Sequence, residues 1–487
     1  MTESHYSPRR RTALVLSGTG TAGAYHAGVL AALHEAGIKI DLVAGRGVGA
    51  VGALFAAVDG GAHLWADNGP WRGHRVRRFY RFRAPLRIAA WALLAGLAAL
   101  LSPLALLALA VLVYVAGLAA ALVGLTAAGP VATAWFGGIL DRLFVPSGVP
   151  TVMPRLVALA LVVALASVAA GAVSWRRDAT RRRGRDAPWW RLAGAPLSAR
   201  SAIADFRSAL WRLIRVAASL PEPRPGEVGR RYAELVLDNL GQSGFREVLV
   251  IAHDLDARED VAFALLGEAD RQRFFSGEHR VHADARTAEA FDLAGAAGDH
   301  VADALAAALS LPVATEPHLV TFRPESYWRG ETHRMCDRPD AVSRLLDETV
   351  AAGAEQIVLV TDAPAPGGPH GLAAGRRELK ARAGEYLRAA ETAAVADALR
   401  ARARRFERLF VIRPTHNPVG PFDVRGAYDE RSDRHHTLAE LVDRGYEDAY
   451  RQFIEPIVGA SGEKLEVANR APAASPLSSS DPASRIV

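Results

Sequence analysis

Two short glycine-rich segments near the start of the chain hold the residues whose types and spacing could support chemistry. The first is Gly18-Thr19-Gly20-Thr21-Ala22-Gly23, and the second is Gly45-Arg46-Gly47-Val48-Gly49. Each follows an apolar run and precedes a segment rich in small residues. A glycine turn between a strand and a helix points backbone N–H groups at one spot, where they can hold an anion or a developing oxyanion. The first segment is therefore a candidate anion-binding loop.

The first segment also fits the pattern G-x-G-x-x-G of dinucleotide-binding turns. Such a site requires an acidic residue at the far end of the second strand, where it binds the ribose. The only acidic residue nearby, Asp41, stands at the near end of the predicted strand Ile40–Ala44, and Gly45-Arg46 stand at the far end. The fingerprint alone is weak, so we expect neither a nucleotide nor any other cofactor.

The second segment has the form of a nucleophile elbow, G-x-S-x-G, with glycine in place of serine. In an elbow, the serine sits on a sharp strand-to-helix turn that is crowded by backbone. Glycine tolerates such a backbone better than serine does, but it supplies no hydroxyl. Gly47 therefore preserves the turn and removes the nucleophile.

The order of these segments resembles the patatin-like phospholipase family. That family shows a strand, an oxyanion loop G-G-G-x-[RK]-G, a helix, a second strand and G-x-S-x-G, and Leu14–Ala57 follows this order and spacing. Gly244–Asp256, Ala308–Phe322 and Gly353–Ala363 are similar to later family segments, so the resemblance covers roughly residues 10–70 and 200–455. It implies an α/β fold, a layered α/β/α domain, and a lipid acyl hydrolase with a serine–aspartate dyad.

The resemblance also shows where this chain departs from the family's catalytic pattern. The nucleophile position falls on Gly47. In the oxyanion loop, Thr19 replaces a glycine and Ala22 replaces the basic residue. The family's acid lies in a D-G-[GA] motif, and the best match, Arg329-Gly330-Glu331, has arginine in place of the acid; Asp337 and Asp340 lie nearby, but neither precedes a glycine. Covalent catalysis needs a nucleophile, so the sequence predicts a pseudoenzyme with no intact catalytic residue.

Two other functions stay open. A working phospholipase or esterase would need a relocated nucleophile, and Cys336, Ser17, Thr19 and Thr21 are the candidates. Alternatively, the chain is a structural membrane protein that offers only an interaction surface.

The histidine groups His435-His436, near Asp433, and His253-Asp254, near Asp256, lack the i, i+4 histidine spacing of a helical metal site, so we predict no metal.

Strands that alternate with helices must position these loops, which favours a layered α/β sheet. Apolar runs predict strands at Thr12–Leu16, Ile40–Ala44, Glu247–Ala252, Gln356–Thr361 and Leu409–Ile412. Helical spacing predicts helices at Gly23–Gly37, Ala50–Ala57, Ala202–Ala218, Tyr232–Leu240, Ala302–Leu309, Glu378–Arg405 and Thr437–Phe453.

The net charge of +6 in this chain of 487 residues comes from two local clusters. Seven arginines lie between Arg72 and Arg87, and six lie between Arg176 and Arg185. Without those 13 arginines and Asp178, 45 basic and 51 acidic residues remain, which argues against a nucleic-acid-binding surface.

A single cysteine excludes an internal disulfide, and the excess of arginine over three lysines is typical of a bacterial protein.

Between the two arginine clusters lie stretches that are long enough to cross a membrane. No charged residue occurs from Ile88 to Leu140, and 20 uncharged residues run from Leu156 to Trp175. The first stretch is either one bent span or a tight hairpin at Ser102-Pro103. We favour two crossings, one within or overlapping Leu104–Ala128 and one at Leu156–Trp175, with an interfacial linker at Val131–Val149.

We therefore expect a patatin-like domain that is interrupted by a transmembrane helical insertion. Its parts are residues 1–70, the basic-flanked insertion 71–187, residues 188–458 and a disordered tail 459–487. Because both arginine clusters should stay in the cytoplasm, the globular domain is expected on the cytoplasmic side of the inner membrane. Its expected partners are membrane lipid, above all anionic lipid, and in addition an acyl or lipid ligand or a protein partner.

Overall fold

The chain divides into two compact units. The computed structural model describes residues 6–178, 194–215, 220–276, 289–365, 378–402, 408–429 and 432–457. Unit 1 comprises Met1–Phe79, Ala199–Pro312 and Pro317–Val487, and unit 2 comprises Tyr80–Ser198 and Val313–Glu316. These limits lie slightly C-terminal to the boundaries at residues 70 and 187 expected from the sequence. The expected tail, residues 459–487, lies outside the described residues.

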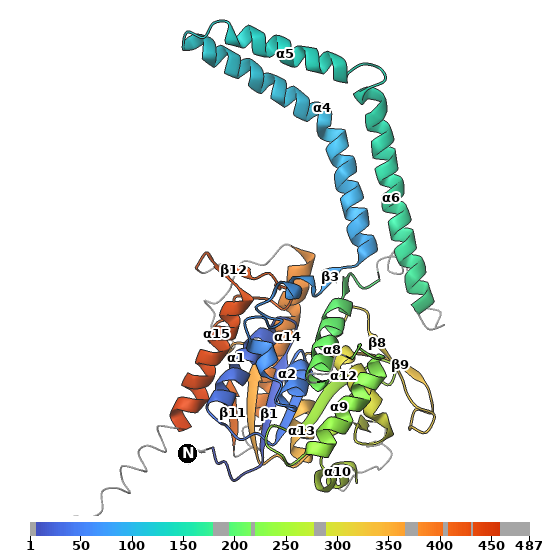
Figure 1. Cartoon of the computed structure of the whole chain (residues 1–487), viewed down its shortest axis with the longest axis vertical. Coiled ribbons are helices and arrows are strands. Elements are labelled where there is room, and N and C mark those ends of the chain that lie inside the picture. The colour runs from blue at the N-terminus through green and yellow to red at the C-terminus, as the bar shows by residue number, and fades with distance from the viewer. Residues whose placement is uncertain are drawn as a thin grey trace, which may run out of the picture. The chain divides into compact units, whose positions relative to one another are not determined.

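Unit 1 is built on a nine-stranded mixed sheet (Figure 1). Its main path runs β11-β10-β1-β2-β5-β6-β7, and β9 pairs with both β5 and β8. The strands are β1 (Thr12–Gly18), β2 (Leu42–Gly47), β5 (Glu247–Asp254), β6 (Glu259–Leu265), β7 (Ala290–Asp292), β8 (His318–Thr321), β9 (Thr332–Cys336), β10 (Gln356–Thr361) and β11 (Leu409–Ile412). The strands from β11 to β5 are parallel, whereas β6 and β9 pair with β5 in the antiparallel sense.

Helices cover both faces of this sheet, because its parallel strands are apolar on both sides. Val15 of β1 belongs to one core with Leu345 and Val395, which lie on helices of one face. Leu16 points to the other face, where its side chain closely approaches Gly52. The predicted layered α/β fold is thereby confirmed.

The helices of unit 1 connect the strands and carry the glycine turns at their starts. They are α1 (Ala22–Glu35), α2 (Gly49–Ala56), α3 (Ala62–Trp65), α8 (Arg200–Ile214), α9 (Pro225–Asn239), α10 (Glu268–Phe275), α12 (Val301–Leu309), α13 (Val342–Ala351), α14 (Leu379–Arg402) and α15 (Leu438–Ala449). Short elements are η1 (His74–Arg78), η2 (Ala296–His300), the π-helical turn Tyr450–Ile454, and the hairpin of β12 (Ala427–Asp429) and β13 (Arg434–His436).

Unit 2 consists of three helices and a small two-stranded pairing. The helices are α4 (Ala84–Leu122), α5 (Ala128–Leu143) and α6 (Val149–Asp178), and β3 (Arg81–Phe82) pairs with β4 (Leu197–Ser198). Two helices among the described residues, Ala84–Leu122 and Val149–Ala172, are long and apolar enough to cross a membrane by length and composition. Because α4 continues through Pro103, the expected alternative of a tight hairpin at Ser102-Pro103 is wrong.

The close contact between α1 and α15 depends on glycine and can be tested. A Cβ atom at Gly28 would lie 1.8 Å from the Val442 carbonyl oxygen. We expect Gly28→Ala to lower the free energy of unfolding by about 1–3 kcal/mol, because the two backbones must move apart. Gly226→Ala is the matched control, since its Cβ would lie 3.4 Å from Asp299 in ordinary contact. Equal stabilities in urea denaturation would contradict this packing.

Candidate functional site

Both glycine turns lie at the carboxyl ends of neighbouring strands. β1 and β2 are parallel, and their register places Ser17 beside Arg46 and Gly18 beside Gly47. The chain then enters α1 after the first turn and α2 after the second. Every residue of both turns is buried. The two loops singled out in the sequence therefore meet at one edge of the sheet, inside the protein.

The space beside Gly47 is already filled by backbone. Gly47 has φ +56°, and a Cβ atom built on it would lie 2.2 Å from the carbonyl oxygen of Gly18 and 2.9 Å from Oδ2 of Asp337. The N–H of Val48, the residue after the elbow position, donates a hydrogen bond of 2.9 Å to the same Gly18 oxygen. In hydrolases with an elbow, that N–H is one of the oxyanion donors. Here it has an acceptor from the chain itself.

The first glycine loop is likewise closed by a segment from the C-terminal part of unit 1. Thr21 donates from its N–H to the carbonyl of Pro421 at 3.2 Å and from Oγ1 to the carbonyl of Gly420 at 2.9 Å. Gly20 has φ +61°, and its Cβ would lie 2.0 Å from the Pro421 oxygen. Only glycine allows this approach. The chain thus places its own carbonyl oxygens against the loop.

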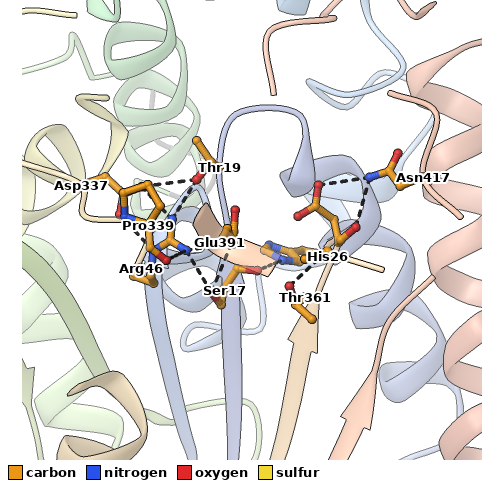
Figure 2. A network of polar contacts seen from close by, with 11 residues as sticks. Ser17, Thr19, His26, Arg46, Asp337, Pro339, Thr361, Glu391 and Asn417 are labelled. Atoms are coloured by element: carbon orange, nitrogen blue, oxygen red, sulfur yellow. Dashed lines mark hydrogen bonds and ion pairs between the residues drawn. The ribbon is translucent and has the colours of Figure 1, made fainter. Parts of the chain in front are cut away.

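The centre of the site is the guanidinium of Arg46, whose side chain is fully buried (Figure 2). Nε and Nη2 donate to the two carboxylate oxygens of Asp337, at 3.0 and 2.8 Å. Nη1 donates to Glu391 at 2.7 Å. The remaining acceptors are Ser17 Oγ at 3.1 Å, the Pro339 carbonyl at 3.1 Å and Thr19 Oγ1 at 2.8 Å. One cation therefore holds together the ends of β1, β2 and β9 and the middle of α14.

Comparisons with known proteins agree with this geometry. Residues 14–115, from β1 into α4, match the family model described as patatin-like phospholipase. This part of the chain resembles the patatin-like phospholipase family. The resemblance found in the sequence is thereby confirmed.

Individual relatives match only in part. A stretch of 45 residues is 56% identical to patatin-like phospholipase domain-containing protein 6 of Mus musculus, Pongo abelii and Homo sapiens. It makes up 9% of this chain and 3% of each relative, so the chain matches a small part of their length. The crystal structure of VipD from Legionella pneumophila aligns with 93% of this chain and 68% of VipD, at 14% identity and a TM-score of 0.29.

The patatin-like site contains Asp337, whereas Arg329 lies elsewhere. Arg329, to which the motif assigned the acid position, is exposed in the turn between β8 and β9, with φ +46°. Asp337 follows the last residue of β9, and its N–H donates to the Ser310 carbonyl at 2.7 Å. Its carboxylate lies against Gly47. Sequence reasoning noted Asp337 and passed over it for lack of a following glycine.

Glu391 was missed altogether, since nothing in its local sequence marks it. It lies in α14 and is 2% exposed. The available signal was Arg46 itself: an arginine inside a run of small residues between a strand and a helix is placed where only buried carboxylates can balance its charge.

Burial and charge shift the pKa values of this network. Desolvation disfavours the charge of Arg46, but Asp337 and Glu391 outweigh it and raise the pKa of the guanidinium above its usual value. Burial, followed by the negative charge of Glu391, raises the pKa of Asp362 to about 7. Burial lowers the pKa of His26 to about 3, so its ring is neutral and bonds the Ser17 carbonyl at 3.2 Å.

The other predicted candidates have ordinary structural partners. His253 bonds Asp260 at 2.8 Å, and the ring of His435 lies edge-on to that of Tyr428. Among the residues that the structure describes, no group of three or more His, Cys, Asp or Glu side chains could hold a metal ion. Burial raises the pKa of Cys336 to about 12, so its thiol is protonated at neutral pH.

Removal of the central cation tests the network. We expect Arg46→Met to lower the free energy of unfolding by about 3–5 kcal/mol, because Asp337 and Glu391 would stay buried without a counter-charge. Arg400→Met is the control: Arg400 pairs with Asp397 on the surface, with 76% of its side chain exposed, and should cost less than about 1 kcal/mol. Similar losses for both variants in urea denaturation would refute the central role of Arg46.

The carboxyl of Asp362 predicts a pH dependence of stability. Its pKa is raised from 3.8 to about 7, so the folded state keeps a proton that the unfolded chain releases. Its stabilising contribution is complete below pH 3.8 and is lost as the pH rises toward 7. We expect Asp362→Asn to remove this loss while retaining the Asn417 contact. Thermal melts between pH 3.8 and 7 measure this dependence, and Asp238→Asn, at an exposed position, is the control. If stability falls with pH as steeply in Asp362→Asn as in the wild type, Asp362 is not the group responsible.

Proposed function

We propose that this chain is a membrane-anchored patatin-like protein that contacts lipid without hydrolysing it and acts in lipid binding or regulation. The observation that carries this proposal is the filled space at the elbow. The Gly18 carbonyl lies where a nucleophilic side chain at position 47 would project, and Asp337, the nearest carboxylate, is paired with Arg46.

Acyl transfer in this family requires three parts: a nucleophile, a group that activates it and donors for the oxyanion. Gly47 supplies no nucleophile. Both oxygens of Asp337 accept hydrogen bonds from Arg46. The N–H groups of Val48 and Thr21 already donate to carbonyl oxygens of the chain. The nucleophile is therefore absent, and the carboxylate and these two N–H groups already form hydrogen bonds within the protein.

The structure also argues against a relocated nucleophile. Cys336 is 3% exposed, and the raised pKa of its thiol keeps the reactive thiolate scarce. Thr19 is 1% exposed, and its hydroxyl accepts from Arg46 at 2.8 Å and lies 3.5 Å from Asp337. Ser17 is fully buried and also accepts from Arg46. A substrate carbonyl has no approach to these atoms without movement of the loops.

The membrane contact is proposed from α4 and α6 together with the basic residues that precede them. Arg75, Arg77, Arg78 and Arg87 are exposed and flank the start of the apolar region. Arginines near a lipid surface each contribute about 1 kcal/mol of attraction to anionic headgroups. By the positive-inside rule, these arginines support a position of unit 1 on the cytoplasmic side of the inner membrane.

The test is labelling of the detergent-purified protein with a fluorophosphonate probe, which reacts with activated serines. We expect no label on the wild type. Gly47→Ser should also stay unlabelled and lose about 1–3 kcal/mol of stability, from φ +56° and the contact with Gly18. Gly37→Ser is the matched control: Gly37 has φ +63° and nothing within 4 Å, so only the strain is shared.

One outcome would replace the proposal. Label on the wild type would show a working hydrolase, and mapping the labelled peptide would identify its nucleophile. Label on a folded Gly47→Ser variant alone would contradict the filled space at the elbow, because it would show that the site opens and lacks only the serine. Native mass spectrometry then checks lipid retention: retained anionic lipid supports the proposal, whereas no lipid together with a crosslinked protein partner indicates the structural alternative.

A further inference from the structure

The two halves of α4 have different partners within unit 2. Before Pro103, α4 runs alongside α6: the Cβ of Ala160 lies 3.1 Å from a Cβ built on Gly96, and Pro85 lies beside Gly171. After Pro103, α4 pairs with α5, where a Cβ built on Gly117 would lie 2.9 Å from the Cα of Gly129. Figure 1 shows α4 bending away from α6 in its second half, with α5 alongside it.

Proline accounts for the bend. Pro103 has no N–H to continue the helical hydrogen bonds, and its ring clashes with the preceding turn. The hydroxyl of Ser102 donates to the Ala99 carbonyl at 2.7 Å, one turn earlier. Helix α4 therefore changes direction at a defined position.

The charges of α6 set the thickness that the α4–α6 pair can cross. Between Arg155 and Arg176 lie 20 uncharged residues of α6, which span about 30 Å, the thickness of the hydrocarbon core. On α4, 15 uncharged residues, Ile88–Ser102, precede Pro103 and span about 22 Å, so the long side chain of Arg87 has to extend to the near headgroups. Because Ala160 lies opposite Gly96 in the antiparallel pair, Arg155 lies near Leu101. The far membrane surface therefore coincides with the bend at Pro103.

The part of unit 2 beyond Pro103 exposes too much apolar surface to be stable in water. We call it the distal arm; it comprises α4 from Leu104 to Leu122 and α5. Its large side chains are widely exposed in the protein, with Leu112 at 64%, Leu118 at 57% and Trp135 at 68%. Asp141 and Arg142, at the end of α5, are exposed as well. Apolar side chains with charged residues at one end are typical of segments that lie at the boundary of headgroups and acyl chains.

We propose that the distal arm is a lipid-binding surface that lies in the far leaflet, and that only α4 before Pro103 and α6 cross the bilayer. This inference rests on the proposed membrane anchoring and identifies its lipid contact. It replaces the crossing expected at Leu104–Ala128 with a shorter one that ends at Pro103. Its ligand is the glycerol and upper acyl region of the leaflet opposite to unit 1.

The single native cysteine makes this arrangement testable in the full chain. Cys336→Ala provides the background, and one cysteine at a time replaces Leu94, Leu112, Leu118, Trp135 or Asp238. Each variant carries a bimane label and is reconstituted in vesicles of phosphatidylglycerol and phosphatidylcholine. Phospholipids with a doxyl quencher at a shallow or a deep acyl position then report the depth of each label.

We expect the label at Leu94 to be quenched more by the deep doxyl lipid, and the labels at Leu112, Leu118 and Trp135 more by the shallow one. External iodide should quench the label at Asp238, on the surface of unit 1, and spare the distal arm, because the arm faces the opposite leaflet. Deep quenching at Leu112 would overturn the proposal in favour of a crossing through the arm. If the arm labels are not quenched by either doxyl lipid while the label at Leu94 is, the arm lies in water or is covered by protein, and the proposal is overturned.

Failure of the anchoring itself has a different signature. If the label at Leu94 is also unquenched by either doxyl lipid, α4 does not enter the bilayer and the proposed function loses its membrane part. Within the distal arm, two labelled positions on α4 and one on α5 ensure that the result does not depend on one position that the label itself disturbs.

Discussion

The buried charge of Arg46 is the constraint on which the rest of the site depends. A guanidinium without solvent is tolerable only where carboxylates and other acceptors surround it, since desolvation of an ion costs several kcal/mol. Asp337 and Glu391 meet that need, although they come from the end of β9 and the middle of α14. The ion pairs therefore hold four separate parts of unit 1 in one arrangement. They also lie beside the two glycine turns.

This constraint is incompatible with the geometry of a serine–aspartate dyad. Oδ2 of Asp337 accepts from Arg46 at 2.8 Å and lies 2.9 Å from the position of a Cβ on residue 47. A serine there and the guanidinium would compete for the same oxygen. Without Arg46, Asp337 would be a buried carboxylate with no counter-charge. Glycine at position 47 and arginine at position 46 therefore depend on each other. Because it has no side chain, Gly47 leaves room for the carboxylate of Asp337, and Arg46 supplies the counter-charge of that carboxylate.

The sequence predicts the parallel part of the fold well and the antiparallel part poorly. The strands β1, β2, β5 and β10 are runs that are buried almost throughout, β11 is an apolar run that is partly buried, and each was expected within a few residues. The strands β6 to β9 were not expected. Polar residues begin β6 and β9, at Glu259 and Thr332, β7 and β8 have only three and four residues, and the pairing of all four is set by tertiary contacts. The same limit applies to the site. Local motifs place Gly18–Gly23 and Gly45–Gly49 together, but the motif for the acid favoured Arg329, and the positions of Asp337 and Glu391 follow only from the folded chain.

The two units divide the protein's chemistry between them. In unit 1, the two glycine turns are engaged in internal hydrogen bonds and lie beside the buried ion pairs of Arg46. In unit 2, long apolar surfaces stay exposed and are held only by helix contacts through small residues such as Gly96 and Gly117. Rigid polar packing suits a protein that presents a fixed surface, whereas exposed apolar helices need lipid around them. In the proposed function, lipid is therefore contacted by the helices of unit 2 and not by the glycine turns of unit 1.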